Sequence, residues 1–275
     1  MLQLNPQVLD TGTPPIPAAR AWMASYGGHH GPAIDLSQAA PGAPPPAELL
    51  ARLGAAAARP EVARYGAILG DAALREAYAR NVAAAYGGDV SPADVAITAG
   101  CNLAFLAAVL AAAGPGSSVI LPAPWYFNHQ MTLQMLGIGV TPLPCRPEDR
   151  FVPDVAAAEA LIDATTRALV LVTPNNPTGA IYPEGVIAGF ADLARRRGLA
   201  LIVDETYRDF HSADGAPHQL FSHDDWRDGF VHLYSFSKVF HLTGHRVGAI
   251  VTGAPRRSAR CRALSGFPPW PAARR

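Results

Sequence analysis

Reactive and polar side chains in this sequence recur directly after short runs of Val, Ile and Leu. Lys238, the only lysine, follows one such run; Ser235 and Ser237 precede it, and Arg246 lies eight residues beyond. An amine in surroundings that lower its pKa attacks aldehydes, while hydroxyls and an arginine fork suit a phosphate dianion. A lone lysine is most often a solvated surface side chain, but the apolar run before Lys238 favours a reactive one.

Further turns after apolar runs carry groups suited to a planar heterocycle. Asp204 ends one run, where a buried carboxylate needs a positive partner such as a protonated ring nitrogen; capping of the next segment is the alternative. Residues 100–102 form a small-residue turn before a helical segment, a pattern typical of backbone that binds phosphate. Trp125 and Tyr126 could stack on a ring or pack over the sheet edge, and the Asn176 amide could reach a ligand oxygen.

From residue 95 onward, short apolar runs alternate with helical segments. Continuous Val/Ile/Leu runs separated by helices predict an α/β fold, a mostly parallel seven-stranded sheet sandwiched by helices. Ligands bind such sheets beyond the carboxyl ends of the strands, where the reactive residues fall. The predicted strands are 95–98, 118–121, 138–143, 168–172, 199–203, 231–234 and 247–252. The predicted helices are 47–58, 71–86, 102–113, 125–136, 154–164 and 184–197.

Composition divides the chain into three parts. Residues 1–46 are rich in proline and glycine without sustained periodicity, which predicts an irregular N-terminal arm. Residues 47–255 are predicted to form one α/β domain that begins with two helices. Residues 256–275 carry six arginines and no apolar period. We interpret this tail as the product of a frameshift or truncation, with a solvated basic tail as the alternative.

Charge, cysteines and hydropathy exclude several classes of protein. Basic and acidic residues balance at 22 each, so no overall field favours nucleic acid or an anionic membrane. Three widely spaced cysteines argue against a disulfide framework and predict a cytoplasmic protein. The N-terminus lacks a signal-peptide pattern, and the longest apolar stretch, 103–113, is far shorter than the roughly 20 residues of a membrane span.

Two other binding chemistries find little support in the sequence. His241 and His245 have the spacing of a metal pair, but Gly244 interrupts the segment and no HExxH-type glutamate accompanies them. We therefore predict no metal. A dinucleotide-binding domain is the general α/β alternative, and it fails because no G-x-G-x-x-G follows a strand.

Taken together, the motifs resemble fold-type-I pyridoxal 5′-phosphate (PLP) enzymes, specifically the class I/II aminotransferases. The matching segments are Tyr65-Gly-Ala-Ile-Leu-Gly, Asn176-Pro-Thr-Gly, Asp204-Glu-Thr-Tyr and Ser-Phe-Ser-Lys238, the last followed by Arg246-Val-Gly. Their order and spacing make the set specific, and the resemblance covers about residues 30–255. It implies the PLP-binding large domain of these enzymes. The family's C-terminal small domain, whose arginine binds the substrate carboxylate, is largely missing from this sequence.

The resemblance implies a role for each matching residue near the cofactor ring. Lys238 would form an aldimine with PLP and then move the proton between the substrate Cα and the cofactor C4′. Asp204 would pair with the pyridinium nitrogen and make the ring an electron sink. Asn176 and Tyr207 would hydrogen-bond the phenolic oxygen. Tyr126 would stack on the ring, or its neighbour in the sequence if the alignment is shifted by one residue.

The resemblance also implies phosphate contacts, a partner and an activity. The residues implied to hold the phosphate are Gly100, Cys101, Asn102, Ser235, Ser237 and Arg246. Tyr65 would reach the phosphate of the neighbouring subunit, since these enzymes build their sites at a homodimer interface. The implied activity moves an amino group between an amino acid and a 2-oxo acid. Another PLP reaction, such as a lyase or decarboxylase, and a catalytically silent PLP-binding fragment are the alternatives.

Overall fold

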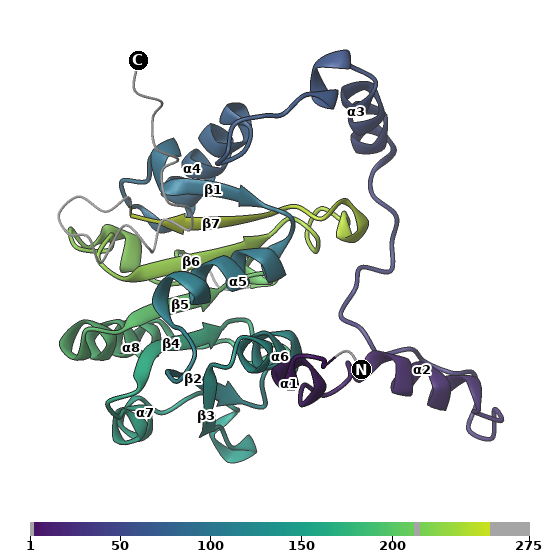
Figure 1. The fold of residues 1–275 in the computed structure, drawn as a ribbon. Coiled ribbons are helices and arrows are strands. Elements are labelled where there is room, and N and C mark those ends of the chain that lie inside the picture. Colours follow the sequence, from purple (N-terminus) through teal and green to yellow (C-terminus); the bar gives the residue numbers. More distant parts are fainter. Residues whose placement is uncertain (1–2, 212–214, 254–275) are drawn as a thin grey trace.

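One sheet of seven strands organises the chain (Figure 1). A computed structural model describes residues 3–211 and 215–253. The strands are β1 (Val95–Thr98), β2 (Ser118–Ala123), β3 (Gly139–Pro144), β4 (Thr166–Val172), β5 (Ala200–Asp204), β6 (Phe230–Ser235) and β7 (Gly248–Thr252). Their order is β1-β7-β6-β5-β4-β2-β3. Only β7 runs antiparallel to its neighbours β1 and β6, so the predicted mostly parallel sheet is confirmed.

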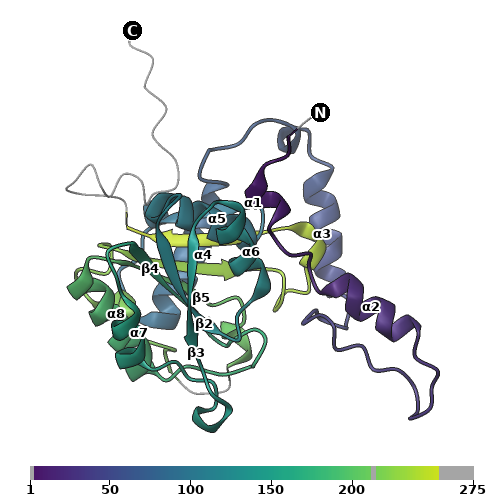
Figure 2. The ribbon, with the colours of Figure 1, turned by 60° about the horizontal axis from the view of Figure 1, so that its bottom comes forward.

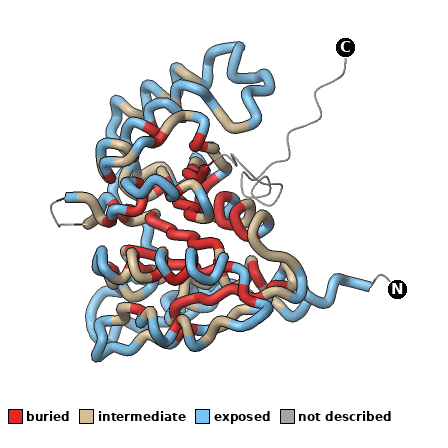
Figure 3. Tube along the Cα trace, turned by 90° about the vertical axis from the view of Figure 1, so that its left-hand side faces the viewer, coloured by how far each residue is buried: buried red, intermediate tan, exposed pale blue. Residues whose placement is uncertain are grey.

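Helices cover both faces of the sheet because alternate strand residues point to opposite sides. Leu169 and Leu171 of β4 pack with α4 (Ala72–Tyr86), α7 (Val155–Leu161) and α8 (Glu184–Arg197). Ala168 and Val170 pack on the other side with α5 (Cys101–Ala112) and α6 (Phe127–Met135). In Figure 2, α7 and α8 lie across the strands from α5 and α6. The buried residues in Figure 3 lie mostly between these layers.

Local sequence signals explain where the helices begin and end. Asp71 caps α4 by accepting from the Leu74 N–H at 3.1 Å, and Gly87 ends the helix with φ 75°. Helix α7 is three residues shorter at its C-terminus than predicted, because the Asp163 carboxylate binds the Thr165 and Thr166 N–H groups in a turn. Helix α6 begins two residues later than predicted, since β2 continues to Ala123.

The N-terminal arm is more ordered than predicted. It contains α1 (Pro6–Leu9) and α2 (Ile16–Ala24), each with proline in its first turn, and Asn5 caps α1 through the Gln7 N–H at 3.0 Å. Helix α3 (Ala47–Ala57) follows the arm, and none of these three helices contains a buried residue. Figure 1 shows α2 and α3 standing away from the sheet.

The remaining connections include short 3-10 turns. They span Pro60–Ala63, Pro92–Asp94, Pro147–Asp149, Arg208–Phe210, Leu220–Ser222 and Thr243–His245. Among the described residues, no helix has the length and hydropathy to cross a membrane. The tail at 256–275, interpreted from the sequence as a frameshift or truncation product, lies outside the described residues.

Candidate active site and family

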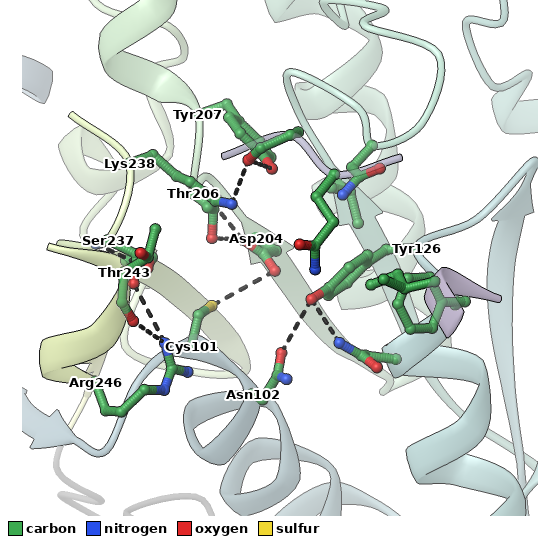
Figure 4. Close-up of a pocket in the computed structure, with 18 of the residues that line it drawn as sticks. Cys101, Asn102, Tyr126, Asp204, Thr206, Tyr207, Ser237, Lys238, Thr243 and Arg246 are labelled. Atoms are coloured by element: carbon green, nitrogen blue, oxygen red, sulfur yellow. Dashed lines mark hydrogen bonds between the residues drawn. The ribbon is translucent and has the colours of Figure 1, made fainter. Parts of the chain in front are cut away.

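A cavity of about 280 Å³ opens at the carboxyl ends of β4, β5 and β6 (Figure 4). It lies where ligands bind parallel α/β sheets. The predicted site residues that line it are Cys101, Asn102, Tyr126, Asn176, Asp204, Tyr207, Ser235, Ser237, Lys238 and Arg246. Gly100 and Tyr65 complete the predicted set but do not line the cavity. The structure therefore brings together residues that are up to 145 positions apart in the sequence.

Asp204 lies at the end of β5 and is only 3% exposed. Its Oδ1 accepts hydrogen bonds from the Thr206 N–H at 3.0 Å and the Thr206 hydroxyl at 2.7 Å. Its Oδ2 lies 3.5 Å from the Cys101 sulfur. Burial by itself raises the pKa of Asp204, but contacts with His129 and Thr206 outweigh it and hold the pKa below its ordinary value. The carboxylate is therefore charged and faces a ligand cavity.

His129 is a site residue that sequence reasoning missed. It is 1% exposed on α6 and stacks on Phe105 of α5, with ring centroids 3.8 Å apart. Its Nε2 lies 3.2 Å from Asp204 Oδ2, although the two groups are not aligned as a hydrogen bond. No motif links residues 129 and 204, so only the packing of α6 against the sheet reveals the contact.

Lys238 comes from the turn after β6 and is partly buried. Its Nζ donates a hydrogen bond to the Ala39 carbonyl of the arm and lies 5.4 Å from the centroid of the Tyr207 ring. Burial, and then the charge of Arg246, lower the pKa of Lys238. Lower pKa makes the neutral, nucleophilic amine more accessible, which agrees with the reactive lysine expected from the sequence.

Arg246 forms one end of the site, next to the start of α5. Its Nη1 donates to the Thr243 carbonyl at 2.9 Å and lies 3.5 Å from the Ser237 hydroxyl. A Cβ at Gly100 would lie 2.2 Å from Arg246 Nη2, and a Cβ at Gly248 would lie 2.6 Å from the Gly100 carbonyl carbon. Glycine at both positions therefore lets the guanidinium reach the helix start, whose first N–H groups lack partners within the helix.

Tyr126, and not Trp125, faces the cavity. The Tyr126 hydroxyl accepts from Asn128 Nδ2 at 2.6 Å and donates to Asn102 Oδ1 at 3.4 Å. Trp125 instead packs against the cluster beneath α5 and α6. Figure 4 shows Tyr126 across the cavity from Lys238. Burial, partly offset by the Asn128 hydrogen bond, raises the pKa of Tyr126.

Tyr207 lies beside Lys238 (Figure 4). Its hydroxyl donates to the Ala39 carbonyl at 3.5 Å. Burial, followed by the charges of Tyr126 and Asp204, raises the pKa of Tyr207 to about 12, so its hydroxyl keeps its proton near neutral pH. Asn176, which also lines the cavity, opposes this shift.

The arm supplies the remaining wall of the cavity, a contribution absent from the sequence prediction. Ile16, Ser37, Gln38 and Ala39 line it, although nothing in their residue types suggests a ligand. Tyr65, by contrast, is fully exposed in the single chain and contacts no cavity residue. Its predicted role across a subunit interface stays a prediction.

Comparison with known proteins supplies the family. The family model for aminotransferase class I and II matches residues 27–267. The chain belongs to this family. The matched range extends beyond residue 255, where the resemblance in the sequence motifs ends. Because PLP is the cofactor of class I and II aminotransferases, the predicted cofactor is confirmed at the level of the family.

The similar proteins are also named as aminotransferases. This chain is 34% identical over 258 residues to a valine–pyruvate aminotransferase of Mycobacterium tuberculosis. The aligned region covers 92% of this chain and 65% of that protein. The structure of a Thermus thermophilus aspartate aminotransferase with maleate has a TM-score of 0.81 at 25% identity, covering 97% of this chain and 67% of that one. An aminotransferase from Mycobacterium tuberculosis has a TM-score of 0.80 at 29% identity, covering 96% and 66%. All three are aminotransferases, so the lyase and decarboxylase alternatives are not favoured.

The cavity fits PLP on three observations. It has a buried carboxylate, Asp204, suited to a protonated ring nitrogen. It has an amine of lowered pKa, Lys238, suited to an aldehyde. At its Arg246 end, glycine at position 100 lets the guanidinium lie beside the start of α5, where two kinds of phosphate-binding group, an arginine and a helix N-terminus, come together. The chain spans 65% of the length of its valine–pyruvate aminotransferase relative.

Proposed function

We propose that this chain is the PLP-binding part of an aminotransferase that moves an amino group between an amino acid and a 2-oxo acid. The observation that carries the proposal is that Lys238, Asp204 and Arg246 all face one cavity of about 280 Å³. These three side chains match the aldehyde, ring nitrogen and phosphate of one cofactor. In an α/β protein without such a ligand, an amine, a buried carboxylate and an arginine facing the same cavity would have no evident use.

In this proposal each residue acts on a stated atom. Bound PLP supplies an electron sink for the negative charge that is left when a substrate Cα–H bond breaks. The Lys238 amine would accept that proton from the substrate Cα and deliver it to the cofactor C4′. Asp204 keeps the ring nitrogen protonated, and the Thr206 hydrogen bonds hold the carboxylate in place. The Tyr207 hydroxyl, which keeps its proton, donates to the phenolic oxygen together with Asn176.

The other predicted contacts form two groups in the proposal. Tyr126 covers one face of the ring, and its hydroxyl is fixed by Asn102 and Asn128. Phosphate binding is assigned to Gly100, Cys101, Asn102, Ser235, Ser237 and Arg246. Gly100 contributes through its backbone and through the space that it leaves for the guanidinium.

A homodimer is also part of the proposal. Large apolar side chains are exposed along the arm and the segment after α3, including Trp22 (74%), Leu36 (88%) and Ile68 (75%). Exposed apolar surface of this extent is typical of a protein interface. Tyr65 is in the same region and would donate to the phosphate in the partner's site. The predicted cytoplasmic location stays a prediction.

A half-reaction assay tests the proposed activity. The purified chain, loaded with PLP, is mixed with valine, aspartate or glutamate, and absorbance is followed for conversion to pyridoxamine 5′-phosphate. Conversion with at least one amino acid, reversed by a 2-oxo acid such as pyruvate, is the expected result. Lys238→Ala is the control and is expected to convert none. Binding of PLP without conversion by any amino acid would leave the silent-fragment alternative in place of transamination.

A further inference from the structure

A second buried polar cluster lies directly behind the candidate site, on the opposite face of the sheet. Its centre is Glu205, which is 1% exposed and follows Asp204 at the end of β5. Because successive residues of a strand point to opposite faces, Asp204 faces the cavity while Glu205 faces α4. Among the described residues no group of three or more His, Cys, Asp or Glu side chains is arranged to hold a metal ion.

Three groups, from helix α4, strand β6 and the loop before Leu220, converge on one oxygen of Glu205. The Tyr86 hydroxyl, at the end of α4, donates a hydrogen bond to Oε2. His232 Nε2, on β6, lies 2.9 Å from the same oxygen, and His218 Nε2 lies 3.4 Å from it. The two imidazole contacts are close but not aligned as full hydrogen bonds. All three partners are at most 1% exposed, so water does not compete with Glu205 for their polar groups.

The neighbouring atoms determine the proton positions. His218 Nδ1 accepts from the Leu220 N–H at 3.2 Å, so its proton is on Nε2, facing Glu205. Neither ring nitrogen of His232 has an aligned hydrogen-bond partner, but Nε2 lies 2.9 Å from the Glu205 carboxylate, so a proton on Nε2 faces a negative charge. Burial lowers the pKa of His232, which favours the neutral ring. Both rings therefore present an N–H to the carboxylate.

These contacts keep Glu205 charged inside the protein. Burial by itself raises the pKa of Glu205, but His218 and His232 outweigh it and hold the pKa far below its ordinary value. The nearby Arg208 is 7% exposed; its guanidinium lies over the Tyr86 and Tyr234 rings, 5.7 and 4.3 Å from their centroids, and pairs with Asp209. A buried charge with this many fixed partners resists displacement, since moving it separates the charge from all of them at once.

Backbone hydrogen bonds connect Glu205 to the cavity residues on either side of it. The Glu205 N–H donates to the Leu233 carbonyl at 2.9 Å, just past the last β5–β6 residue pair. Its carbonyl accepts from the Arg208 N–H at 3.1 Å, which closes the turn that contains Thr206 and Tyr207. Residue 205 is therefore the link between Asp204 and this turn, and the contacts of the Glu205 side chain restrain the position of that link.

We propose that Glu205 is a positioning residue, which fixes Asp204 and Tyr207 in the cavity from the opposite face of the sheet through its contacts with Tyr86, His218 and His232. The cofactor-binding consequence rests on the function proposed above, whereas the effect on the backbone does not. A displacement of the Glu205 peptide turns the Asp204 carboxylate away from the ring nitrogen and moves Tyr207 relative to Lys238. Local order of residues 204–208 and affinity for PLP are thereby linked to a carboxylate that never contacts the ligand.

Glu205→Gln tests the proposal, with Asp94→Asn as the matched control. Both replace a buried carboxylate by an isosteric amide, and Asp94, 6% exposed, binds Arg227 at the far end of β1. Two quantities are measured: amide hydrogen exchange in the peptide covering 204–208, and the dissociation constant for PLP. In Glu205→Gln we expect exchange there to become about tenfold faster and PLP affinity to fall about tenfold, because the amide removes the negative charge that the buried donors face and adds N–H donors without an acceptor. Asp94→Asn is expected to change neither.

A milder variant keeps the test decisive if Glu205→Gln does not fold. Tyr86→Phe removes one hydroxyl and keeps the ring, and the same two changes are expected with smaller size. Unchanged exchange at 204–208 in the folded variants, or equal acceleration in β2 and β4, would overturn the positioning role. Failure of the unmutated chain to bind PLP would refute the proposed function instead, and the exchange measurement would still decide the role of Glu205.

Discussion

Gly100 offers a sharp test of the phosphate end of the site. In Gly100→Ala the new Cβ would lie 2.2 Å from Arg246 Nη2 and 2.8 Å from its Cζ, so the guanidinium must move away from the start of α5. The backbone there also has φ 85°, which costs a residue with a side chain about 1–3 kcal/mol. Losing one charge-assisted contact to the phosphate costs about 1.5–3 kcal/mol. We therefore expect the dissociation constant for PLP to rise about 10- to 100-fold.

The assay compares two ligands that differ only in the phosphate. The chain is titrated with PLP and with pyridoxal, and the absorbance of the lysine adduct gives each dissociation constant. Gly100→Ala is expected to weaken PLP binding but to leave pyridoxal binding almost unchanged. The control is Gly185→Ala inside α8, where a Cβ meets nothing within 4 Å, and it is expected to bind both ligands normally. Equal PLP affinity in Gly100→Ala and the unmutated chain would refute the assignment of the phosphate end.

Three further predictions concern pH and stability. Because burial and Arg246 lower the pKa of Lys238, the pH profile of the rate of adduct formation with pyridoxal should have its midpoint below pH 10.5, and Arg246→Gln should move that midpoint upward in stopped-flow measurements. Burial opposes ionisation of Asp94, but Arg227 outweighs it and lowers the pKa of Asp94 below 3.8. The ionised Asp94 therefore stabilises the folded chain above pH 3.8, and this contribution is lost as the pH falls through the folded-state pKa. Asp94→Asn should therefore lower the free energy of urea unfolding at pH 7 and have less effect in acid. Phe190→Ala, at a residue 1% exposed between α8 and the sheet, should cost about 3–5 kcal/mol in the same assay.

Most of the fold could be predicted from the sequence because the central strands β4, β5, β6 and β7 are buried on both faces. Runs such as Leu169–Val172 and Leu201–Val203 are continuously apolar, and each strand end lies within two residues of its predicted position. The arm was predicted less well. Its two helices are short and contain no buried residue, so hydrophobic periodicity, the main signal for a helix, is weak there. Their capping and proline positions carry the remaining local information.

The candidate site divides along similar lines. Asp204 and Lys238 could be found because they lie at the carboxyl ends of parallel strands, which meet at one edge, and Arg246 because it begins the antiparallel return from that edge. His129 could not, because it lies inside a helix and reaches Asp204 only through the packing of α6. Glu205 was visible as the neighbour of Asp204, but its partners Tyr86, His218 and His232 are scattered over 147 positions. Only the three-dimensional structure brings them together.

Covalent capture of the cofactor tests the central claim most directly. The chain is incubated with PLP, reduced with borohydride, digested and analysed by mass spectrometry. Since Lys238 is the only lysine, the N-terminal amine is the one competing primary amine, and the two are separated by peptide mass. The account predicts a phosphopyridoxyl group on the Lys238 peptide at one per chain, abolished by Lys238→Ala. A label confined to the N-terminal peptide, or none at all from a folded chain, would contradict it.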